Sequence, residues 1–378
     1  MNLHNQPHTS SQIHYVRVRI DPEYLLDTNI VNAQKLDAVL PLMLKDYARF
    51  EILQKSFKVF CKDLGKCWIV TLDHEFEQIK ALVSDEQYCV IAESSLVPEF
   101  KIFRSSNRFS IFKSLPGWFK QQVIKIAIAD KIETDFYITL DSDIICTKPV
   151  YYQDLIRDGR AVCYIHRTHD HHDWYGWGEK VLNIHNTKNR DFLHNVTPVV
   201  INKHAMLELQ TYLTQVYHTK LSFKPGDLNA VVLKFLTLFL PKDSARRERF
   251  ALKRRDLRVA GLKLLTLFLP KNSTFRSQLL TWKSYLSASD PWTEYGLYYL
   301  FLEETNRFDH YHVEIANCTY TQEDSVWYKE DFEVWDVEKV FSPKSNHFFV
   351  IVQGWLGLDV QEVWQKVGRY LNESTVSR

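Results

Sequence analysis

Glycine is scarce in this sequence, and two common nucleotide-binding motifs are missing with it. Only 11 of the 378 residues are glycine, about 3% against a usual ~7%. Neither G-x-G-x-x-G nor G-x-x-x-x-G-K-[ST] occurs anywhere in the chain. A dinucleotide-binding Rossmann site and a P-loop NTPase are therefore both disfavoured.

The sequence also has little net charge, no paired-cysteine motif and no long apolar run. Its 47 basic and 46 acidic side chains leave a net charge of +1. Such a balance argues against binding of nucleic acid through a large positive charge. The six cysteines show no C-x-x-C spacing, as is typical of reduced core residues in a cytoplasmic protein. No apolar run reaches the ~18 to 20 residues that cross a bilayer, and the polar start MNLHNQPHTSSQ predicts no signal peptide.

Strand-like and helix-like segments alternate from about residue 35 onward. The apolar run LDAVLPLML is followed by YARFEILQKSFKVFCKDL, whose apolar residues recur every three or four positions. KCWIVTL with HEFEQIKALV, and then QYCVIAE, repeat this order at short spacing. Such alternation predicts an α/β fold with a mostly parallel central sheet flanked by helices. The segment IHYVRVRI, within an N-terminal extension over 1–34, predicts an appended strand.

One segment of the chain is duplicated. LKFLTLFLPK at Leu233–Lys242 recurs as LKLLTLFLPK at Leu262–Lys271, and the linker between them carries seven Arg and Lys residues from Arg246 to Arg258. Two copies are fewer than the ~3 that a stacked solenoid needs. We therefore expect a duplicated, basic helical insertion over residues 221–280. The alternative is a non-catalytic membrane-surface module that lies on an anionic bilayer.

Two carboxylates follow a short apolar strand in DFYITLDSDIICTKP. The run Phe136–Leu140 predicts the strand, and Asp141 and Asp143 come directly after it with one serine between them. Ligands of open α/β sheets bind beyond the carboxyl ends of the strands, and strand alternation would place both carboxylates on one side. Such a pair favours Mg²⁺ or Mn²⁺, completed by substrate phosphates. The alternative is a solvated turn.

At these residues the chain resembles a known group. The segments LPLMLKDYARFEILQKSF, GWFKQQVIKI, DFYITLDSDIICTKP, NVTPVVINK and DPWTEYGLYYLF occur in the order seen in a family of uncharacterised bacterial proteins that look like GT-A-type glycosyltransferases. The resemblance implies a GT-A-like fold, a nucleotide-sugar donor and Mn²⁺ or Mg²⁺. It also implies that Asp143 is a direct metal ligand and that Asp141 holds the metal through water, or the donor ribose. In that family the stretch corresponding to the duplicated insertion is shorter.

The resemblance suggests how the chain is organised and what it binds. Residues 35–220 would form the nucleotide-sugar-binding half, and residues 281–378 the acceptor-side and C-terminal part of the same catalytic domain. The acceptor would be a carbohydrate or a lipid-linked molecule, and a peripheral contact with anionic membrane is left open. A nucleotidyltransferase of similar fold is the alternative reading of the same site.

Two carboxylates are candidate general bases if the reaction inverts the anomeric configuration. Glu294 in WTEYGLYY is flanked by aromatic residues, which would raise its pKa by desolvation and offer faces to a sugar ring. Asp290 is a second, weaker candidate. The alternative for Glu294 is a carboxylate in the first turn of a helix, where the macrodipole favours it, with Thr293 or Asp290 as the cap.

Further candidates lie on either side of the two aspartates in the sequence. In GWFKQQVIKI, we expect Trp118, Gln121, Gln122 and Lys125 to face the donor, with Lys125 neutralising its diphosphate. The alternative is a solvated helix face with Trp118 in the core. GT-A enzymes often use a further histidine as a metal ligand, and His347 is the candidate here. A structural role for that histidine is the alternative.

A histidine-rich stretch allows one other class of enzyme. Six imidazoles and carboxylates fall within eight residues: His166, His169, Asp170, His171, His172 and Asp173. Ligands of this kind suit Zn²⁺ or Fe²⁺ in a metal-dependent hydrolase. No H-E-x-x-H or comparable spacing is present, so a loop that binds acceptor or phosphate is the preferred interpretation.

Overall fold

The computed structural model describes one unit of the protein. The chain divides into Met1–Gln34 and Lys35–Arg378, and all helices and strands given below belong to the second unit. The described residues are 34–104, 117–167, 172–184, 192–194, 197–220, 275–276, 279, 292–315 and 324–372. The expected N-terminal strand and nearly all of the expected duplicated insertion lie outside these ranges.

The centre of the fold is a five-stranded sheet with the order β10-β4-β1-β2-β3. Its strands are β1 (Leu36–Pro41), β2 (Leu64–Thr71), β3 (Tyr88–Ala92), β4 (Phe136–Thr139) and β10 (Val199–Asn202). β1 to β4 run parallel, and only β10 is antiparallel, against β4. All six residues of β1 and all four of β4 are buried, as expected for strands covered by helices on both faces. The α/β prediction with a mainly parallel sheet is confirmed.

The strand order reverses between β1 and β4. From β1 the chain proceeds to β2 and then β3 on one side, and β4 returns to the opposite side of β1. The Leu140 N–H donates to the Val39 carbonyl at 2.9 Å, so the carboxyl ends of β1 and β4 lie side by side. Such a topological switch point opens a crevice at the carboxyl ends of the two strands, where open α/β sheets bind their ligands.

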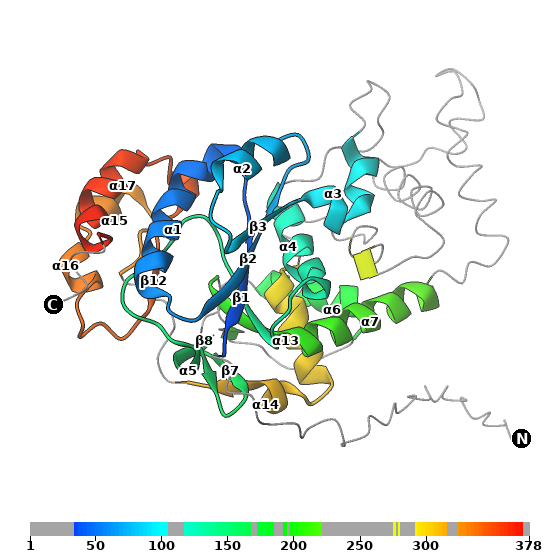
Figure 1. Cartoon of the computed structure of the whole chain (residues 1–378). Helices are drawn as coiled ribbons and strands as arrows, with labels where there is room; N and C mark the ends of the chain where they lie inside the picture. The colour runs from blue at the N-terminus through cyan, green and yellow to red at the C-terminus, as the bar shows by residue number, and fades with distance from the viewer. Residues whose placement is uncertain are drawn as a thin grey trace, which may run out of the picture. The chain divides into compact units, whose positions relative to one another are not determined.

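Helices cover both faces of the sheet, in two apolar clusters. On one face lies α1 (Tyr47–Phe60), whose buried Phe50, Leu53, Phe57 and Phe60 recur every three or four residues. On the other lie α4 (Gly117–Ala127), α6 (His172–Leu182), α7 (Lys203–Lys220) and α13 (Glu294–Glu304). Figure 1 shows α4, α6, α7 and α13 together on the opposite side of the sheet from α1.

The remaining elements are short. The strands are β5 (Ile144–Cys146), β6 (Ile156–Arg157), β7 (Arg160–Cys163), β8 (Ile165–Arg167), β9 (Phe192–His194), β11 (His312–Glu314) and β12 (Phe349–Ile351). The α-helices are α2 (Phe76–Leu82), α3 (Glu93–Leu96), α5 (Tyr152–Leu155), α14 (Phe308–Tyr311), α15 (Lys329–Glu333), α16 (Val337–Val340) and α17 (Val360–Val367). The 3₁₀ turns are η2 (Leu44–Asp46), η3 (Pro98–Arg104), η4 (Ile128–Asp130), η6 (Gly354–Leu356) and η7 (Gly368–Tyr370).

Two of these strands connect the C-terminal segment to the sheet region. β12 pairs antiparallel with β5, with Ile351 opposite Ile144 and Phe349 opposite Cys146. Phe349 also stacks on Phe57 of α1, with ring centroids 6.0 Å apart. The carboxyl end of β12 therefore lies next to the start of β5, directly after the two aspartates of D-x-D.

Within the described ranges, no helix is long and apolar enough to span a bilayer. Five cysteines fall in these ranges and all five are free thiols, three of them buried. The prediction of unpaired, largely internal cysteines is confirmed for that part of the chain.

His312 of β11 is a buried neutral histidine and should make the fold sensitive to acid. Its Nε2 lies 2.8 Å from the Tyr298 hydroxyl, and its ring contacts those of Tyr299 and Phe308. Burial lowers the pKa of His312 from 6.5 to about 3. In the unfolded chain, His312 is therefore protonated below about pH 6.5. In the native protein it stays neutral down to about pH 3.

Stability contributed by neutral His312 is thus present above pH 6.5 and is lost as the pH falls towards 3. We expect a loss of about 1.4 kcal/mol per pH unit in that window from this one group. His312→Gln should melt lower at pH 7.5 but should lose less stability between pH 6.5 and 4 than wild type does. Urea unfolding of both proteins at pH 6.5 and pH 4 measures this loss of stability. An equal loss in wild type and His312→Gln would refute the prediction.

Candidate functional site

The two aspartates lie at the carboxyl end of β4, beside the switch point. β4 ends at Thr139, Leu140 and Asp141 follow outside any strand, and Ser142 and Asp143 form a turn before β5 begins at Ile144. Because the chain turns here, strand alternation does not extend to Asp143, contrary to the sequence-based expectation. Asp141 contacts Lys125 of α4, whereas Asp143 accepts the backbone N–H of Gly354, which follows β12.

Asp143 is held by the C-terminal segment. The Gly354 N–H donates to Asp143 Oδ2 at 2.9 Å, and the Val352 N–H donates to the Asp143 carbonyl at 2.9 Å. A cavity of about 20 Å³ beside Asp143 is lined by Arg49, Ser142 and Gln353, among others. This volume is enough for about one water molecule and far too small for a nucleotide.

The environment of Asp143 is unfavourable for a bare negative charge. Desolvation and the neighbouring charge of Asp141 raise its pKa from 3.8 to about 6, although the Gly354 N–H opposes the shift. Two carboxylates this close in sequence and space gain stability when a cation joins them.

Lys125 of α4 connects Asp141 to Glu294 of α13. Its Nζ lies 2.9 Å from Asp141 Oδ1 and 3.2 Å from Glu294 Oε1. Only 2% of the side chain of Lys125 and 2% of that of Glu294 are exposed, whereas 36% of Asp141 is exposed. Asp141 is therefore the most accessible member of this trio.

A fully buried lysine keeps its charge here because of its partners. Burial lowers the pKa of Lys125, but Asp141, Tyr295 and Glu294 outweigh that effect and raise it well above the ordinary value. The three carboxylates at Asp141, Asp143 and Glu294 thus face one paired cation. When all four groups are ionised, the cluster carries an excess of two negative charges, which one divalent cation would balance.

Glu294 is the first residue of α13. Thr293 caps this helix by accepting the Gly296 N–H at 2.9 Å, and the Glu294 N–H donates to Gln122 Oε1 at 3.2 Å. The helix-terminus arrangement, with Thr293 as the cap, is therefore present. Burial raises the pKa of Glu294, against the opposing effect of Lys125, as the sequence-based reading expected.

The second carboxylate oxygen of Glu294 has no hydrogen-bond partner among the described residues. Oε2 is buried, and none of the described residues donates to it. The aromatic neighbours Trp292 and Tyr298 are fully buried, so they desolvate Glu294 but do not present faces to a sugar, contrary to expectation. A general-base role for Glu294 stays a prediction.

The other candidates on α4 have different surroundings. Trp118 is 41% exposed and is therefore not a core residue. The alternative of a solvated helix face with Trp118 in the core is wrong. Gln121 is half-buried, and Gln122 is buried against Trp118 and Glu294. The structure brings Gln122 and Lys125 together with Glu294 and Asp141, and leaves Trp118 accessible at the start of the helix.

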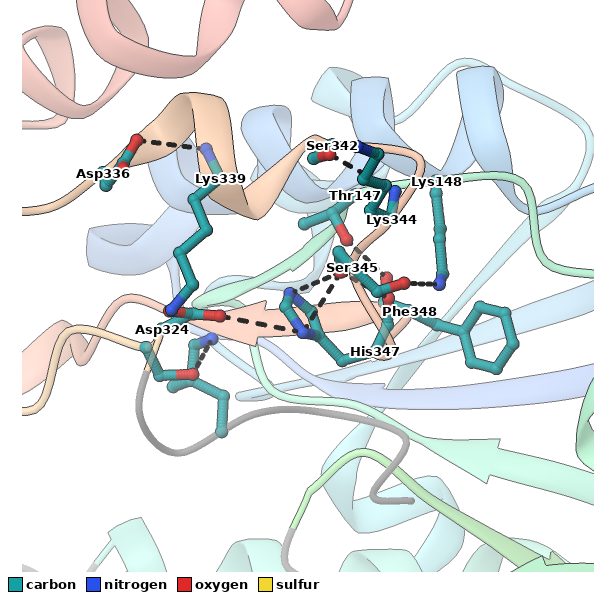
Figure 2. A network of polar contacts seen from close by, with 12 residues as sticks. Thr147, Lys148, Asp324, Asp336, Lys339, Ser342, Lys344, Ser345, His347 and Phe348 are labelled. Carbon is teal, nitrogen blue, oxygen red and sulfur yellow. Dashed lines mark hydrogen bonds and ion pairs between the residues drawn. The ribbon is translucent and has the colours of Figure 1, made fainter.

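His347 lies at the opposite end of β12 from Asp143. Val352 is the neighbour of Asp143, and His347 precedes it by five residues, roughly 17 Å of extended chain. Figure 2 shows His347 beside Ser345 and Asp324. Its ring lies 3.2 Å from the Ser345 hydroxyl and 4.0 Å from the Asp324 carboxylate. Burial lowers its pKa to about 4. The structure does not bring His347 together with the two aspartates.

Two other sets of candidates lie outside the described residues. Asp290 is one, and the side chains of the histidine-rich stretch are the other. Within the described part of the chain, no three His, Cys, Asp or Glu residues are grouped so that they could hold a metal ion.

Sequence reasoning missed several contacts of the site. Gly354 carries no motif, and its role depends on the pairing of β12 with β5, which sequence patterns do not give. Thr139 and Thr197 both contact the Tyr295 hydroxyl, at 2.7 and 2.8 Å. The one signal for Thr139 was a polar residue at the end of an otherwise apolar strand.

Comparison with solved structures gives low similarity to several transferases. Mouse xyloside xylosyltransferase 1 is 12% identical, with 86% of this chain and 99% of that chain covered and a TM-score of 0.36. The glycosyltransferase GlyE of Streptococcus pneumoniae TIGR4 is 15% identical, with 80% and 71% covered and a TM-score of 0.26. The 4-diphosphocytidyl-2C-methyl-D-erythritol synthase of Anaerococcus prevotii is 13% identical, with 50% and 78% covered and a TM-score of 0.29.

These scores are too low to transfer a function, so we take the functional argument from the residues of this chain. A search of curated protein sequences gives no significant match. A family model matches residues 33–375, nearly the whole chain, including the D-x-D segment, α4 and α13. The protein therefore belongs to the family described as "Family of unknown function (DUF6492)".

Proposed function

We propose that the protein is a divalent-cation-dependent glycosyltransferase that moves a sugar from a nucleotide-sugar donor to a hydroxyl of a carbohydrate or lipid-linked acceptor. The observation that carries the proposal is the placement of Asp141 and Asp143 at the carboxyl end of β4, beside the switch point with β1. This is the position at which open α/β sheets bind nucleotides and related ligands.

The donor set of the site fits Mg²⁺ or Mn²⁺. Carboxylate oxygens are the ligands these hard cations prefer, and Mg²⁺ is commonly held by one or two carboxylates plus substrate phosphates. Among the described residues, Lys125 contacts Oδ1 of Asp141 and the Gly354 N–H donates to Oδ2 of Asp143. The second oxygen of each residue would hold the cation, and a diphosphate would complete its coordination.

The bound cation would neutralise the charge that develops on the departing nucleoside diphosphate. The residues of the chain bind and orient the donor around it. Trp118 and Gln121 lie on the accessible part of α4 and are our candidates for contacts with the nucleoside. Glu294 is the candidate base for the acceptor hydroxyl, because desolvation raises its pKa and Oε2 has no partner among the described residues.

The reaction itself gives the test of the proposal. Cleavage of the bond between the sugar and the diphosphate releases a nucleoside diphosphate, and this release should require Mn²⁺ or Mg²⁺ and Asp143. Release from a panel of nucleotide sugars, compared with and without the cation, decides whether the proposal holds.

A further inference from the structure

The three protons of the Lys125 ammonium group all have acceptors inside the protein. Nζ lies 2.9 Å from Asp141 Oδ1, 3.2 Å from Glu294 Oε1 and 3.3 Å from Thr197 Oγ1. An ammonium group has three N–H donors and no acceptor, so these three acceptors, with the Tyr295 hydroxyl at 3.5 Å as a fourth, are enough to occupy all of them. With its N–H groups occupied in this way and only 2% of its side chain exposed, Lys125 has no free N–H to offer a ligand's phosphate.

The hydroxyl of Tyr295 sits at the centre of the groups that surround Lys125. It lies 2.7 Å from Thr139 Oγ1, 2.8 Å from Thr197 Oγ1 and 3.5 Å from Lys125 Nζ. Burial raises the pKa of Tyr295, so the hydroxyl keeps its proton. Tyr295 follows Glu294 directly in the first turn of α13. The hydrogen bonds of the Tyr295 hydroxyl therefore also help to fix the backbone position of Glu294.

Counting protons sets the direction of each hydrogen bond in this chain of hydroxyls. The Thr139 hydroxyl donates to the Val199 carbonyl at 3.1 Å, so its oxygen must accept the proton of Tyr295. Because a hydroxyl has a single proton, Tyr295 must in turn accept from Thr197. The Thr197 oxygen is then left to accept from Lys125. The order of donation is therefore Lys125 to Thr197 to Tyr295 to Thr139, ending on the backbone of β10.

We infer that Lys125 is a positioning residue for the metal-binding Asp141, held in place by the Thr197–Tyr295–Thr139 hydroxyl chain, and is not a ligand of the donor diphosphate. The inference rests on the proposed function of Asp141 and deepens it. Lys125 engages Oδ1 of Asp141 and thereby fixes the carboxylate that would hold the cation. Outer groups that orient metal ligands typically affect metal affinity by 10 to 100-fold when they are removed.

Tyr295→Phe tests this assignment, because it removes the central hydroxyl and keeps the ring. Tyr137→Phe is the matched control: Tyr137 is also buried, and its hydroxyl donates to the Lys125 backbone carbonyl at 3.1 Å, outside the side-chain network. The measurement is calorimetric titration of Mn²⁺ into the full-length protein with a saturating nucleoside diphosphate, chosen from ADP, CDP, GDP and UDP by thermal shift.

We expect Tyr295→Phe to weaken Mn²⁺ binding by about 10-fold or more, with Tyr137→Phe within about twofold of wild type and similar melting temperatures for both variants. Thr197→Val should weaken Mn²⁺ binding in the same direction as Tyr295→Phe. If wild type binds Mn²⁺ and Tyr295→Phe binds it equally well, the positioning role is overturned while the proposed function survives. Absence of Mn²⁺ binding in wild type would overturn the proposed function itself, and the inference with it.

Discussion

The Asp143→Asn variant should lose Mn²⁺-dependent binding of nucleoside diphosphates while becoming more resistant to heat. The substitution keeps an oxygen that can accept the Gly354 N–H, which lies 2.9 Å from Asp143 Oδ2, but removes the charge that would hold the cation. Loss of an outer positioning group costs 10 to 100-fold in metal affinity, so loss of a direct ligand should cost more than about 100-fold.

The gain in stability follows from the pKa of the same carboxyl group. Desolvation and Asp141 raise the pKa of Asp143 from 3.8 to about 6, so between these values the native state binds a proton that the unfolded chain has released. Native stability therefore falls as the pH rises through this window, and ionised Asp143 destabilises the protein above it. Allowing for its partial exposure, we expect a gain of about 1 to 2 kcal/mol at pH 7.5, or roughly 2 to 4 °C.

Asp135→Asn is the matched control for this prediction. Asp135 directly precedes the first residue of β4, at the end away from Asp141 and Asp143. Of its side chain, 78% is exposed. Asp135→Asn should leave Mn²⁺-dependent binding unchanged. It should change the free energy of unfolding by no more than about 0.5 kcal/mol. Thermal melts at pH 4 and 7.5 should show the advantage of Asp143→Asn only at the higher pH. Unchanged Mn²⁺-dependent affinity in Asp143→Asn would remove this residue from the site.

Glu294→Gln should lower turnover by ~10² to 10⁴, the usual contribution of a positioned acid or base. The amide keeps the shape of the side chain and can still accept from Lys125, which lies 3.2 Å from Glu294 Oε1, but it cannot take up a proton. Mn²⁺-dependent binding of the donor should therefore be close to that of wild type.

The competing interpretation of Glu294 is structural, and the geometry gives it a concrete form. As the first residue of α13, capped by Thr293, the carboxylate interacts favourably with the helix dipole, worth about 0.3 to 1 kcal/mol. On that account alone, Glu294→Gln would leave turnover nearly unchanged, because the amide keeps its contact with Lys125. Glu304→Gln at the exposed end of the same helix is the control, and steady-state kinetics and melts on both variants separate the two roles.

Local sequence patterns were sufficient to predict the sheet and its carboxylates. The apolar runs that became β1, β2, β3 and β4 were recognisable, and the position of the two aspartates after β4 followed from them. The start of α13 was also predictable, because Thr293 and Glu294 form a typical helix N-terminus. These features depend on residues that are close together in the chain.

The rest of the site depends on contacts between distant segments. Helical spacing suggested that Lys125 faces the donor, but packing of α13 onto α4 brings Glu294 within 3.2 Å of its ammonium group and seals it from solvent. No local pattern shows that a residue 169 positions away covers this helix face. The pairing of β12 with β5 likewise brings Gly354 to Asp143 and places His347 at the far end.

The measurement that tests the central claim most directly is an analysis of the products formed from nucleotide sugars. The full-length protein is incubated with Mn²⁺ and a panel of nucleotide sugars, with and without simple glycosides as acceptors, beside the Asp143→Asn variant. We predict release of a nucleoside diphosphate from at least one donor, dependent on Mn²⁺ and absent from Asp143→Asn. Release of a nucleoside monophosphate with a sugar 1-phosphate would instead show cleavage within the diphosphate, and pyrophosphate formed from a nucleoside triphosphate and a sugar phosphate would show nucleotidyl transfer. Either of these results, or no product from any donor, would contradict the account.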